Sequence, residues 1–437
     1  MTKLSHTFTL LAIAFFFLLP MQAQQDFSPK PSEEQLPQAM HSAMDEQPSI
    51  TVGQNKGDIL GTDNRALQAA VDYIANLGGG TVIIGPGTYT MHDSLHLRSH
   101  VTVKGTPEKT ILAKADGAVS LLALDGDFGE EQVTLQNPEG FSLGGGMAIW
   151  DDSAGGFHTT VACITGRRDH TFKISKPLMA DCMVHRNAKA ATVFPVVSGY
   201  HIEGAKITHV IVEGNKKNNI HLNGCRGAGI FLYRGFGAAI EHCTVKNYNG
   251  DGISFQQSND VTVTHCVSEN NASLGIHPGS GSQRPTVTHC MTRNNGTDGL
   301  FLCWRVRHGV FKNNQMENNG RFGISIGHKD SDNILKNNII RGNDSNGIFF
   351  RNETRGMAPH RNRLENNIIE NNGKEAGTAG VRIRGEVNGL MFTNNIIRDT
   401  RAEGEKTQTV GFLIEEKAGE VHLNNNKIEA NTKIKRK

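Results

Sequence analysis

Short hydrophobic segments recur between about residues 229 and 426 with the pattern Gly, apolar, variable, apolar. The glycines that begin these segments are Gly229, Gly252, Gly275, Gly299, Gly323, Gly347, Gly380 and Gly411. Successive glycines are 23, 23, 24, 24, 24, 33 and 31 residues apart. Alternating apolar residues are typical of a strand, and a repeat of about two dozen residues is typical of a solenoid. The pattern therefore predicts stacked coils of short strands.

A second set of positions repeats in the same register. One column holds Val210, Cys243, Cys266, Cys290, Asn314, Asn338, Asn367, Asn395 and Asn426, and Asn pairs follow four and five residues after most of these positions. Asn adopts left-handed backbone readily, and its amide can bond the amide of the next coil, about 4.8 Å away. Helical repeats are disfavoured because Gly and Asn weaken helix interiors. We therefore expect an all-β fold, a right-handed parallel β-helix with Asn columns at its turns.

The repeat changes outside these coils. Thr62 or Asp63 can cap a helix that would close the first coil, with Leu67, Val71, Ile74 and Leu77 on one face. The predicted divisions are capping helix and first coils at 51–130, a small β-rich excursion at 131–183, coils at 184–430 and a frayed basic tail at 431–437. Short antiparallel strands are expected in the excursion, which is a candidate wall of a binding cleft.

The repeats resemble the pectate-lyase superfamily of β-helix proteins. The segments Asp63–Asp72 and Gly78–Tyr89 share that likeness, which covers roughly residues 51–430. This resemblance implies the fold more than the reaction, because the superfamily includes lyases, glycosidases, epimerases and non-catalytic tail proteins. Segments around Asp251, Asp298 and Phe322 resemble motifs of the polygalacturonase-like glycosidases. However, a single Asp replaces an adjacent pair, and Phe322 occupies the position of the catalytic histidine, so that mechanism is not carried over.

The N-terminus predicts export. Lys3 precedes an apolar run from Phe8 to Leu19 and a cleavage-like segment ending at Ala23, so residues 1–23 are predicted to be a signal peptide and 24–50 a flexible leader. No later segment has the roughly 20 apolar residues that span a bilayer. We expect a secreted or periplasmic protein without a membrane partner.

Charge and cysteine content restrict the expected partners and disulfide bonds. There are 45 Lys and Arg against 43 Asp and Glu, a net charge of +2, which disfavours a nucleic-acid partner. Of the seven cysteines, Cys243, Cys266 and Cys290 are expected as a buried column of thiols, whereas Cys163 and Cys182 are the better candidates for a disulfide. The sequence carries no signal for an oligomeric state.

One outward face is expected to collect the unusual polar side chains. Its candidate substrate-binding residues are Gln256, Gln257, His277, Trp304, Arg305, Asp330, Glu353, Arg384 and Glu386. Sugars stack on indole rings, and Arg binds carboxylates or sulfates with two hydrogen bonds. Since cations outnumber acids on this face, the expected partner is an anionic polysaccharide.

The reaction that suits such a face is β-elimination by a polysaccharide lyase. It needs a cation to neutralise the uronate carboxylate, a base and an acid. Lys329 or His328 is the candidate base, and Arg351, with Arg305 and Arg384, is the candidate carboxylate ligand. No cofactor is expected, and calcium stays possible although no compact Asp/Glu cluster marks a site.

Other functions stay open. Asp330, Glu353 and Glu386 on successive coils leave room for a glycoside hydrolase. An epimerase or a non-catalytic glycan-binding surface protein would use the same scaffold. His209, His242, His265 and His289 form an outward column continued by Asn residues. A straight row does not easily give tetrahedral geometry, so a surface ladder is favoured over a metal site.

Overall fold

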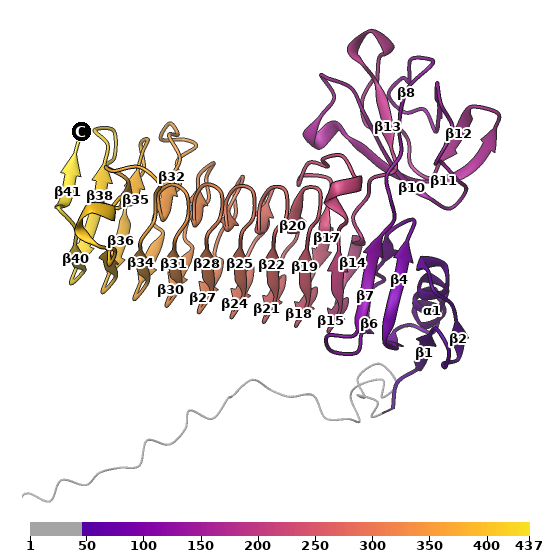
Figure 1. The fold of residues 1–437 in the computed structure, drawn as a ribbon, viewed down its shortest axis with the longest axis horizontal. Coiled ribbons are helices and arrows are strands. Elements are labelled where there is room, and N and C mark those ends of the chain that lie inside the picture. Colours follow the sequence, from indigo (N-terminus) through magenta and orange to yellow (C-terminus); the bar gives the residue numbers. More distant parts are fainter. Residues whose placement is uncertain (1–45) are drawn as a thin grey trace, which may run out of the picture. The chain divides into compact units, whose positions relative to one another are not determined.

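The computed structural model describes residues 46–437, which form three long parallel sheets and one antiparallel sheet (Figure 1). The predicted signal peptide, 1–23, lies outside the described residues, as does the predicted leader except for residues 46–50. The last two of these, Ser49 and Ile50, already belong to strand β1 (Ser49–Gly53). Between residues 46 and 437, no helix is long and apolar enough to span a bilayer.

Sheet A has 13 strands, β1 among them. In spatial order they are β2 (Ile59–Leu60), β1, β3 (Gly80–Ile84), β6 (Val101–Lys104), β15 (Lys206–Thr208), β18 (Ala239–Glu241), β21 (Thr262–Thr264), β24 (Thr286–Thr288), β27 (Val310–Lys312), β30 (Ile334–Lys336), β33 (Arg363–Glu365), β36 (Leu390–Thr393) and β39 (Val421–Asn424).

Sheet B has 11 strands. They are β4 (Gly87–Met91), β7 (Thr110–Lys114), β16 (Ile211–Glu213), β19 (Thr244–Lys246), β22 (Val267–Glu269), β25 (Met291–Arg293), β28 (Gln315–Glu317), β31 (Ile339–Arg341), β34 (Ile368–Glu370), β37 (Ile396–Arg398) and β40 (Lys427–Glu429).

Sheet C also has 11 strands, and most of the glycine-led segments form it. Its strands are β5 (Leu95–His96), β14 (Val197–Glu203), β17 (Ala228–Phe236), β20 (Asp251–Gln256), β23 (Ile276–Gly279), β26 (Leu300–Phe301), β29 (Ile324–Ile326), β32 (Ile348–Phe350), β35 (Ala379–Ile383), β38 (Val410–Ile414) and β41 (Thr432–Arg436).

The chain visits sheets C, A and B in turn, and each strand pairs in parallel with its counterpart one coil later. In sheet C, Ile253 pairs with Ile276, Ile276 with Leu300, and Leu300 with Ile324. These side chains point inward and are at most 1% exposed, so like residues stack into one continuous core. The predicted right-handed parallel β-helix is confirmed.

The Asn columns are ladders of buried amides. Asn338 donates from Nδ2 to Asn367 Oδ1 at 2.9 Å, and the same geometry joins Asn314 to Asn338 at 3.1 Å. A second ladder begins with Asn271 and Asn295, 2.9 Å apart. These bonds satisfy turn groups that would otherwise be buried without partners.

The histidine column is confirmed as a stacked ladder. Consecutive rings of His209, His242, His265 and His289 lie 4.8, 4.8 and 4.9 Å apart. Asn313 continues the column through a 3.0 Å contact with His289.

All seven cysteines lie within the described part of the chain and all are free. Cys243, Cys266 and Cys290 are buried inside successive coils, as expected. Cys163 and Cys182, the better candidates for a disulfide, are not bonded, because Cys182 packs in the core of the excursion while the Cys163 side chain lines a cavity beside helix α1.

The capping helix α1 (Asn64–Asn76) begins after Asp63, whose Oδ1 accepts a hydrogen bond from Arg65 N at 3.0 Å. Its buried Leu67, Val71 and Ile74 join the core at the N-terminal end of the solenoid (Figure 1). Leu77 was expected on the same face, but it follows the helix as the C-cap and is 52% exposed.

The excursion forms its own six-stranded antiparallel sheet. Its strands, in spatial order, are β8 (Val119–Leu121), β13 (Lys189–Ala191), β10 (Gly146–Trp150), β11 (Thr160–Arg168), β12 (Thr171–Ile174) and β9 (Gln132–Thr134). The sheet reaches beyond the predicted limits of 131 and 183 because β8 pairs with β13. It encloses a separate hydrophobic core around Phe141 and Phe172.

The basic C-terminal segment is not frayed. Thr432–Arg436 forms β41, which pairs in parallel with β38. The expectation of a free tail overlooked that β38 presents unpaired backbone groups to this segment.

Candidate functional site

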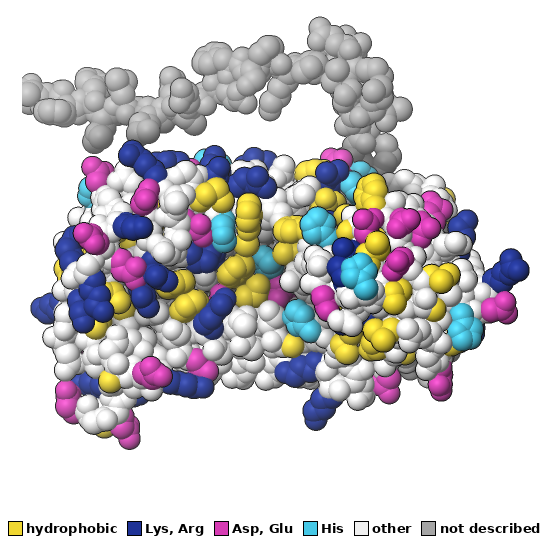
Figure 2. Space-filling view, turned by 90° about the horizontal axis from the view of Figure 1, so that it is seen from above, with side chains coloured by type: hydrophobic (Ala, Val, Ile, Leu, Met, Phe, Trp, Pro, Cys, Tyr) yellow, Lys and Arg dark blue, Asp and Glu magenta, His cyan; other side chains and the backbone are white. Residues whose placement is uncertain are grey.

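The outer face of sheet C and the turns that follow its strands carry most of the predicted site residues. In β20, Ile253 and Phe255 pack in the core, whereas Ser254 and Gln256 alternate with them on the other face. Figure 2 shows the molecule from the side on which sheet C lies in Figure 1, and Lys, Arg, His and hydrophobic side chains mix over these coils. Because the coils are stacked in register, residues at the ends of successive sheet C strands lie side by side on one wall, although they are far apart in the sequence.

Trp304 and His328 stack on each other on this wall. Their ring centroids lie 4.9 Å apart with an interplanar angle of 12°, and His328 Nε2 lies 3.1 Å from Glu353 Oε1. Burial, with the charge of Arg351, lowers the pKa of His328. The other ring nitrogen, Nδ1, is buried without a partner. Neither nitrogen is free to accept a substrate proton, whereas the indole, 41% exposed, offers a surface for a sugar ring.

Arg351 and Asp330 form a largely buried pair beneath this stack. Arg351 Nη2 lies 3.1 Å from Asp330 Oδ2, and Nη1 donates to Ser325 Oγ at 2.8 Å. Asp330 has no exposed surface and also accepts hydrogen bonds from the backbone N–H groups of Val306 and Gly327. In this arrangement both side chains stabilise turns and do not reach an open surface.

Gln256 and His277 face outward from sheet C but are covered. Gln256 is fully buried and His277 is 4% exposed. His277 Nδ1 lies 2.8 Å from Asp251 Oδ2, and a neighbouring backbone, that of Gly224, covers the Asp251 carboxylate closely. The loop that precedes β17 therefore separates this pair from solvent.

Arg384 and Glu386 lie nearer the C-terminal end and have local partners. Arg384 Nε lies 3.0 Å from Glu415 Oε2, and Glu386 Oε2 accepts a hydrogen bond from Arg355 N at 2.8 Å. The predicted carboxylates Asp330, Glu353 and Glu386 thus bond to different neighbours.

Gln257, Arg305 and Lys329 are brought together. With Arg234, Arg307 and neighbouring polar residues they line an open groove of about 750 Å³. We call this the basic groove. It follows the turns that connect sheet C to sheet A.

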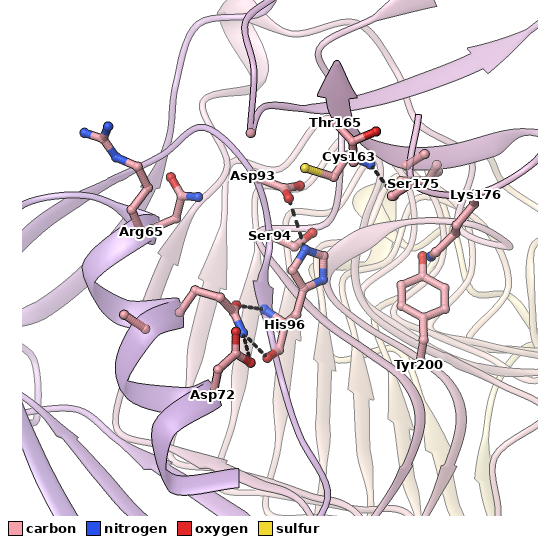
Figure 3. Close-up of a pocket in the computed structure, with 16 residues that line it drawn as sticks. Arg65, Asp72, Asp93, Ser94, His96, Cys163, Thr165, Ser175, Lys176 and Tyr200 are labelled. Carbon is pink, nitrogen blue, oxygen red and sulfur yellow. Dashed lines mark hydrogen bonds and ion pairs between the residues drawn. The ribbon is translucent and has the colours of Figure 1, made fainter. Parts of the chain in front are cut away.

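A second hollow lies between the excursion, helix α1 and the first coils, and it consists of two adjoining cavities. The larger, about 600 Å³, is lined by residues of α1 and by Asp93, His96 and Cys163 (Figure 3). The smaller, about 290 Å³, is lined by Arg226, Tyr233 and residues of the excursion. Val161, Lys176 and Tyr200 line both cavities. We call the pair the cleft, and the excursion does form one of its walls.

Lys176 and Tyr200 lie in direct contact in the cleft. Lys176 Nζ is 3.6 Å from the centroid of the Tyr200 ring, and Figure 3 shows the lysine side chain directed at that ring. Burial lowers the pKa of Lys176 to about 8, with Arg226 contributing in the same direction and Asp93 opposing it. Burial also raises the pKa of the Tyr200 phenol. An amine that is partly neutral near pH 8 suits a base, and a protonated phenol suits an acid.

Arg226 supplies a permanent positive charge to the smaller cavity. Its guanidinium lies over Tyr233, with Cζ 5.2 Å from the ring centroid, and Nε donates to Phe157 O at 2.8 Å. No ion pair of Arg226 occurs within residues 46–437. Its outer nitrogens can therefore bind a carboxylate that enters this cavity.

His96 joins a serine and a carboxylate at the edge of the larger cavity. His96 Nδ1 lies 2.9 Å from Ser198 Oγ, and Nε2 lies 3.1 Å from Asp93 Oδ2. The three residue types match a hydrolytic triad, but Ser198 is fully buried on the outer face of β14. A buried hydroxyl cannot attack a substrate, so the arrangement orients the imidazole instead.

The described residues contain no group of three or more His, Cys, Asp or Glu side chains placed to hold a metal ion. The stacked histidines fit this result, because a straight row of rings does not converge on one point.

Sequence reasoning missed the cleft residues Lys176, Tyr200 and Arg226. They come from the excursion, from β14 and from the loop before β17, where the repeat is broken or has only resumed. The one available signal was the loss of the repeat itself, which marked the excursion as a candidate wall without selecting a side chain.

Comparisons with known proteins agree with the fold. A family model described as "Right handed beta helix region" matches residues 204–359. The search of curated proteins found no matching relative.

Two similar solved structures are A-modules of mannuronan C-5 epimerases from Azotobacter vinelandii. The AlgE6 module is 15% identical, covers 88% of this chain and 95% of its own, and superposes with a TM-score of 0.58. The AlgE4 module is 14% identical, with coverages of 88% and 97% and a TM-score of 0.56. At these identities the likeness concerns the fold alone. With the family match and the stacked coils, it supports the assignment of the chain as a right-handed parallel β-helix protein.

Proposed function

We propose that the protein acts on an anionic polysaccharide by removing the proton from the sugar carbon that bears a carboxylate. The observation that carries this proposal is the Lys176 amine, with a pKa of about 8, in contact with Tyr200 in a cavity that Arg226 also lines. Proton abstraction next to a carboxylate needs a base, a cation and an acid, and this cavity offers one of each.

The favoured reaction is β-elimination by a polysaccharide lyase. Arg226 neutralises the uronate carboxylate, which makes the C5 proton acidic. Lys176 takes that proton, the electron pair forms the C4–C5 double bond, and the C4–O bond breaks. Tyr200 gives its phenol proton to the leaving oxygen. The proton on Lys176 then returns to the tyrosine through solvent, which restores both groups.

Epimerisation at C5 is the second candidate, because the same three groups serve it and two mannuronan C-5 epimerase modules have a similar fold. Its first step is the same proton removal. The carbanion then accepts a proton from the opposite face, and the glycosidic bond stays intact.

Incubation with alginate and polygalacturonate tests both reactions. A lyase raises ultraviolet absorbance through its unsaturated product, whereas an epimerase incorporates deuterium at C5 from D₂O without chain cleavage. Lys176→Met should abolish either signal, while Lys173→Met is the matched control because Lys173 is exposed on β12 and does not line the cleft. Full activity of Lys176→Met would exclude the assigned base.

The apolar run within residues 1–23 supports export of this activity to the periplasm or medium. Fractionation of the producing cells, with mass determination of the mature N-terminus, tests this proposal. An uncleaved chain in the cytoplasmic fraction would contradict it.

A further inference from the structure

The basic groove contains four cations and no carboxylate. Arg234, Arg305, Arg307 and Lys329 line it, and its other lining residues are neutral. No ion pair of these four side chains occurs in the described part of the chain, and Arg307 Nε is buried without any partner. Arg234 Nε instead donates to Gln257 Oε1 at 3.1 Å.

Nearby outward cations are neutralised by contrast. Arg284 binds Asp260 and Arg361 binds Asp332, each at 2.7 Å, and Arg321 binds Asp298 at the same distance. Unpaired like charges that share a groove repel each other until an anion enters. The groove is therefore a local exception to the pairing seen on the surrounding coils.

Backbone strain follows the same line of residues. Positive φ angles occur at Arg234 (53°), Gln257 (50°), Ser280 (49°), Arg305 (69°) and Lys329 (67°), all of which line the groove. In the outward column that continues from the stacked histidines the equivalent conformation is taken by Asn, which tolerates it, for example at Asn313 and Asn337. Arg284 and Arg361, which are paired with carboxylates, also have positive φ angles, so this conformation belongs to the repeated turn, and within residues 46–437 the absence of partner carboxylates is what distinguishes the groove.

The groove adjoins the cleft at two consecutive residues. Arg234 lines the groove, and the preceding Tyr233 lines the smaller cavity of the cleft. The Arg234 guanidinium lies over the Tyr233 ring, with Cζ 5.5 Å from the centroid. From β17 to β29 the groove crosses four coil steps, about 19 Å at the usual strand spacing. This length accommodates several sugar residues.

We propose that one anionic sugar chain occupies the cleft and the basic groove together. The groove holds the carboxylates or sulfates of sugars several residues away from the sugar that lies at Lys176. Arg305 and Lys329 are binding residues in this assignment, and they do not touch the reacting atoms. The inference rests on the proposed function for the reacting sugar, but the groove's affinity for a polyanion is measurable without turnover.

The double variant Arg305→Gln/Lys329→Gln tests the groove kinetically. For polymeric polygalacturonate or alginate, KM should rise about tenfold or more, since tenfold corresponds to the loss of about one charge-assisted hydrogen bond. For the trisaccharide of the same uronan, kcat/KM should not change, because a short chain fills only the cleft. Lys433→Gln/Lys435→Gln is the matched control, since it removes the same charge from the exposed strand β41. An unchanged KM for the polymer would overturn the proposal.

Retention on immobilised polysaccharide separates this inference from the proposed function. The wild-type chain should bind immobilised polygalacturonate and elute as the salt concentration rises, and it should not bind neutral dextran. The double variant should elute from polygalacturonate at a lower salt concentration. Comparing retention on immobilised heparin with retention on polygalacturonate distinguishes recognition of sulfate groups from recognition of carboxylates. If no uronan is turned over but retention depends on Arg305 and Lys329, the proposed reaction is refuted and the proposed binding of polyanions in the groove is supported. Equal retention of variant and wild type would refute the groove alone.

Discussion

His277 and Asp251 form a buried pair on the outer face of sheet C, with Nδ1 of the imidazole 2.8 Å from Oδ2 of the carboxylate. The loop that covers this pair carries Arg226 into the cleft. Ser254 Oγ holds the loop by donating to Gly224 O at 2.8 Å. The buried pair therefore determines how closely Arg226 can approach the sheet.

Gly224→Ala should displace Arg226. A Cβ at this position would lie 1.6 Å from Asp251 Oδ2, so the loop must move away from the sheet. The expected result is a kcat/KM for polygalacturonate or alginate lowered at least several-fold, with a clear fall in kcat, because Arg226 makes the C5 proton acidic; initial rates measure both constants. Gly356→Ala is the control, because no atom lies within 4 Å of its added Cβ. An unaltered kcat/KM for Gly224→Ala would show that the loop does not position Arg226.

The rate should depend on the ionisation of Lys176. Because burial lowers its pKa from 10.5 to about 8, kcat/KM should rise with pH and level off above about pH 8. A profile that is flat between pH 6 and 9 would contradict a lysine base.

The same pKa has a consequence for stability. Between about pH 8 and 10.5 the unfolded chain binds more protons at Lys176 than the folded chain, so the free energy of unfolding should increase with pH over this window. Urea unfolding of the wild type and Lys176→Met at several pH values isolates this contribution. The difference between the two chains should shift in favour of the wild type as the pH rises.

The coils could be predicted from the sequence because each coil repeats the contacts of the one before. The spacing of Gly252 and Gly275 predicts that the strands they begin are paired, and the spacing of Asn314 and Asn338 predicts equivalent turns in successive coils. One repeat length determines both the register of the paired strands and their parallel direction. The sequence also predicted that Trp304 and His328 would be neighbours, which their stacking shows.

The period gives the face of a side chain, but it does not say what covers that face. His277 was placed outward correctly, yet an irregular loop buries it beside Asp251. Lys176 could not be found by any period, because antiparallel pairing in the excursion brings it to Tyr200 of β14. Residues that meet through a break in the repeat require the three-dimensional structure.

The Asn ladder should be essential for stability. Asn338 has no exposed surface and its amide joins Phe311 O and Asn367 Oδ1, both at 2.9 Å, while its Oδ1 accepts from Asn314. Asn338→Ala leaves several buried groups unpaired and should reduce the free energy of unfolding by about 3 kcal/mol. Urea unfolding measures the loss, and the adjacent, less buried Asn337→Gly is the control. A loss below about 1 kcal/mol would mean that water replaces the ladder.

Substitution of Arg351 tests whether this residue has a structural role or a catalytic role. Its guanidinium donates to Leu302 O at 2.6 Å and to Ser325 Oγ at 2.8 Å, contacts the buried Asp330, and lies 4.5 Å above the Phe301 ring centroid. Arg351→Met removes the partner of a buried carboxylate, so the free energy of unfolding should fall by about 3 kcal/mol. Below the unfolding temperature, kcat/KM for the uronan trisaccharide should stay near the wild-type value.

Arg384→Met is the matched control for this variant. Arg384 pairs with Glu415 on a partly exposed surface, so its loss should cost less than about 1 kcal/mol. If Arg351→Met unfolds like the wild type but loses kcat, its guanidinium must leave Asp330 to reach a substrate, and the catalytic centre would then lie over the middle coils. Stability loss with intact turnover shows that Arg351 takes no part in the reaction and that its contacts with Asp330 and Ser325 are structural.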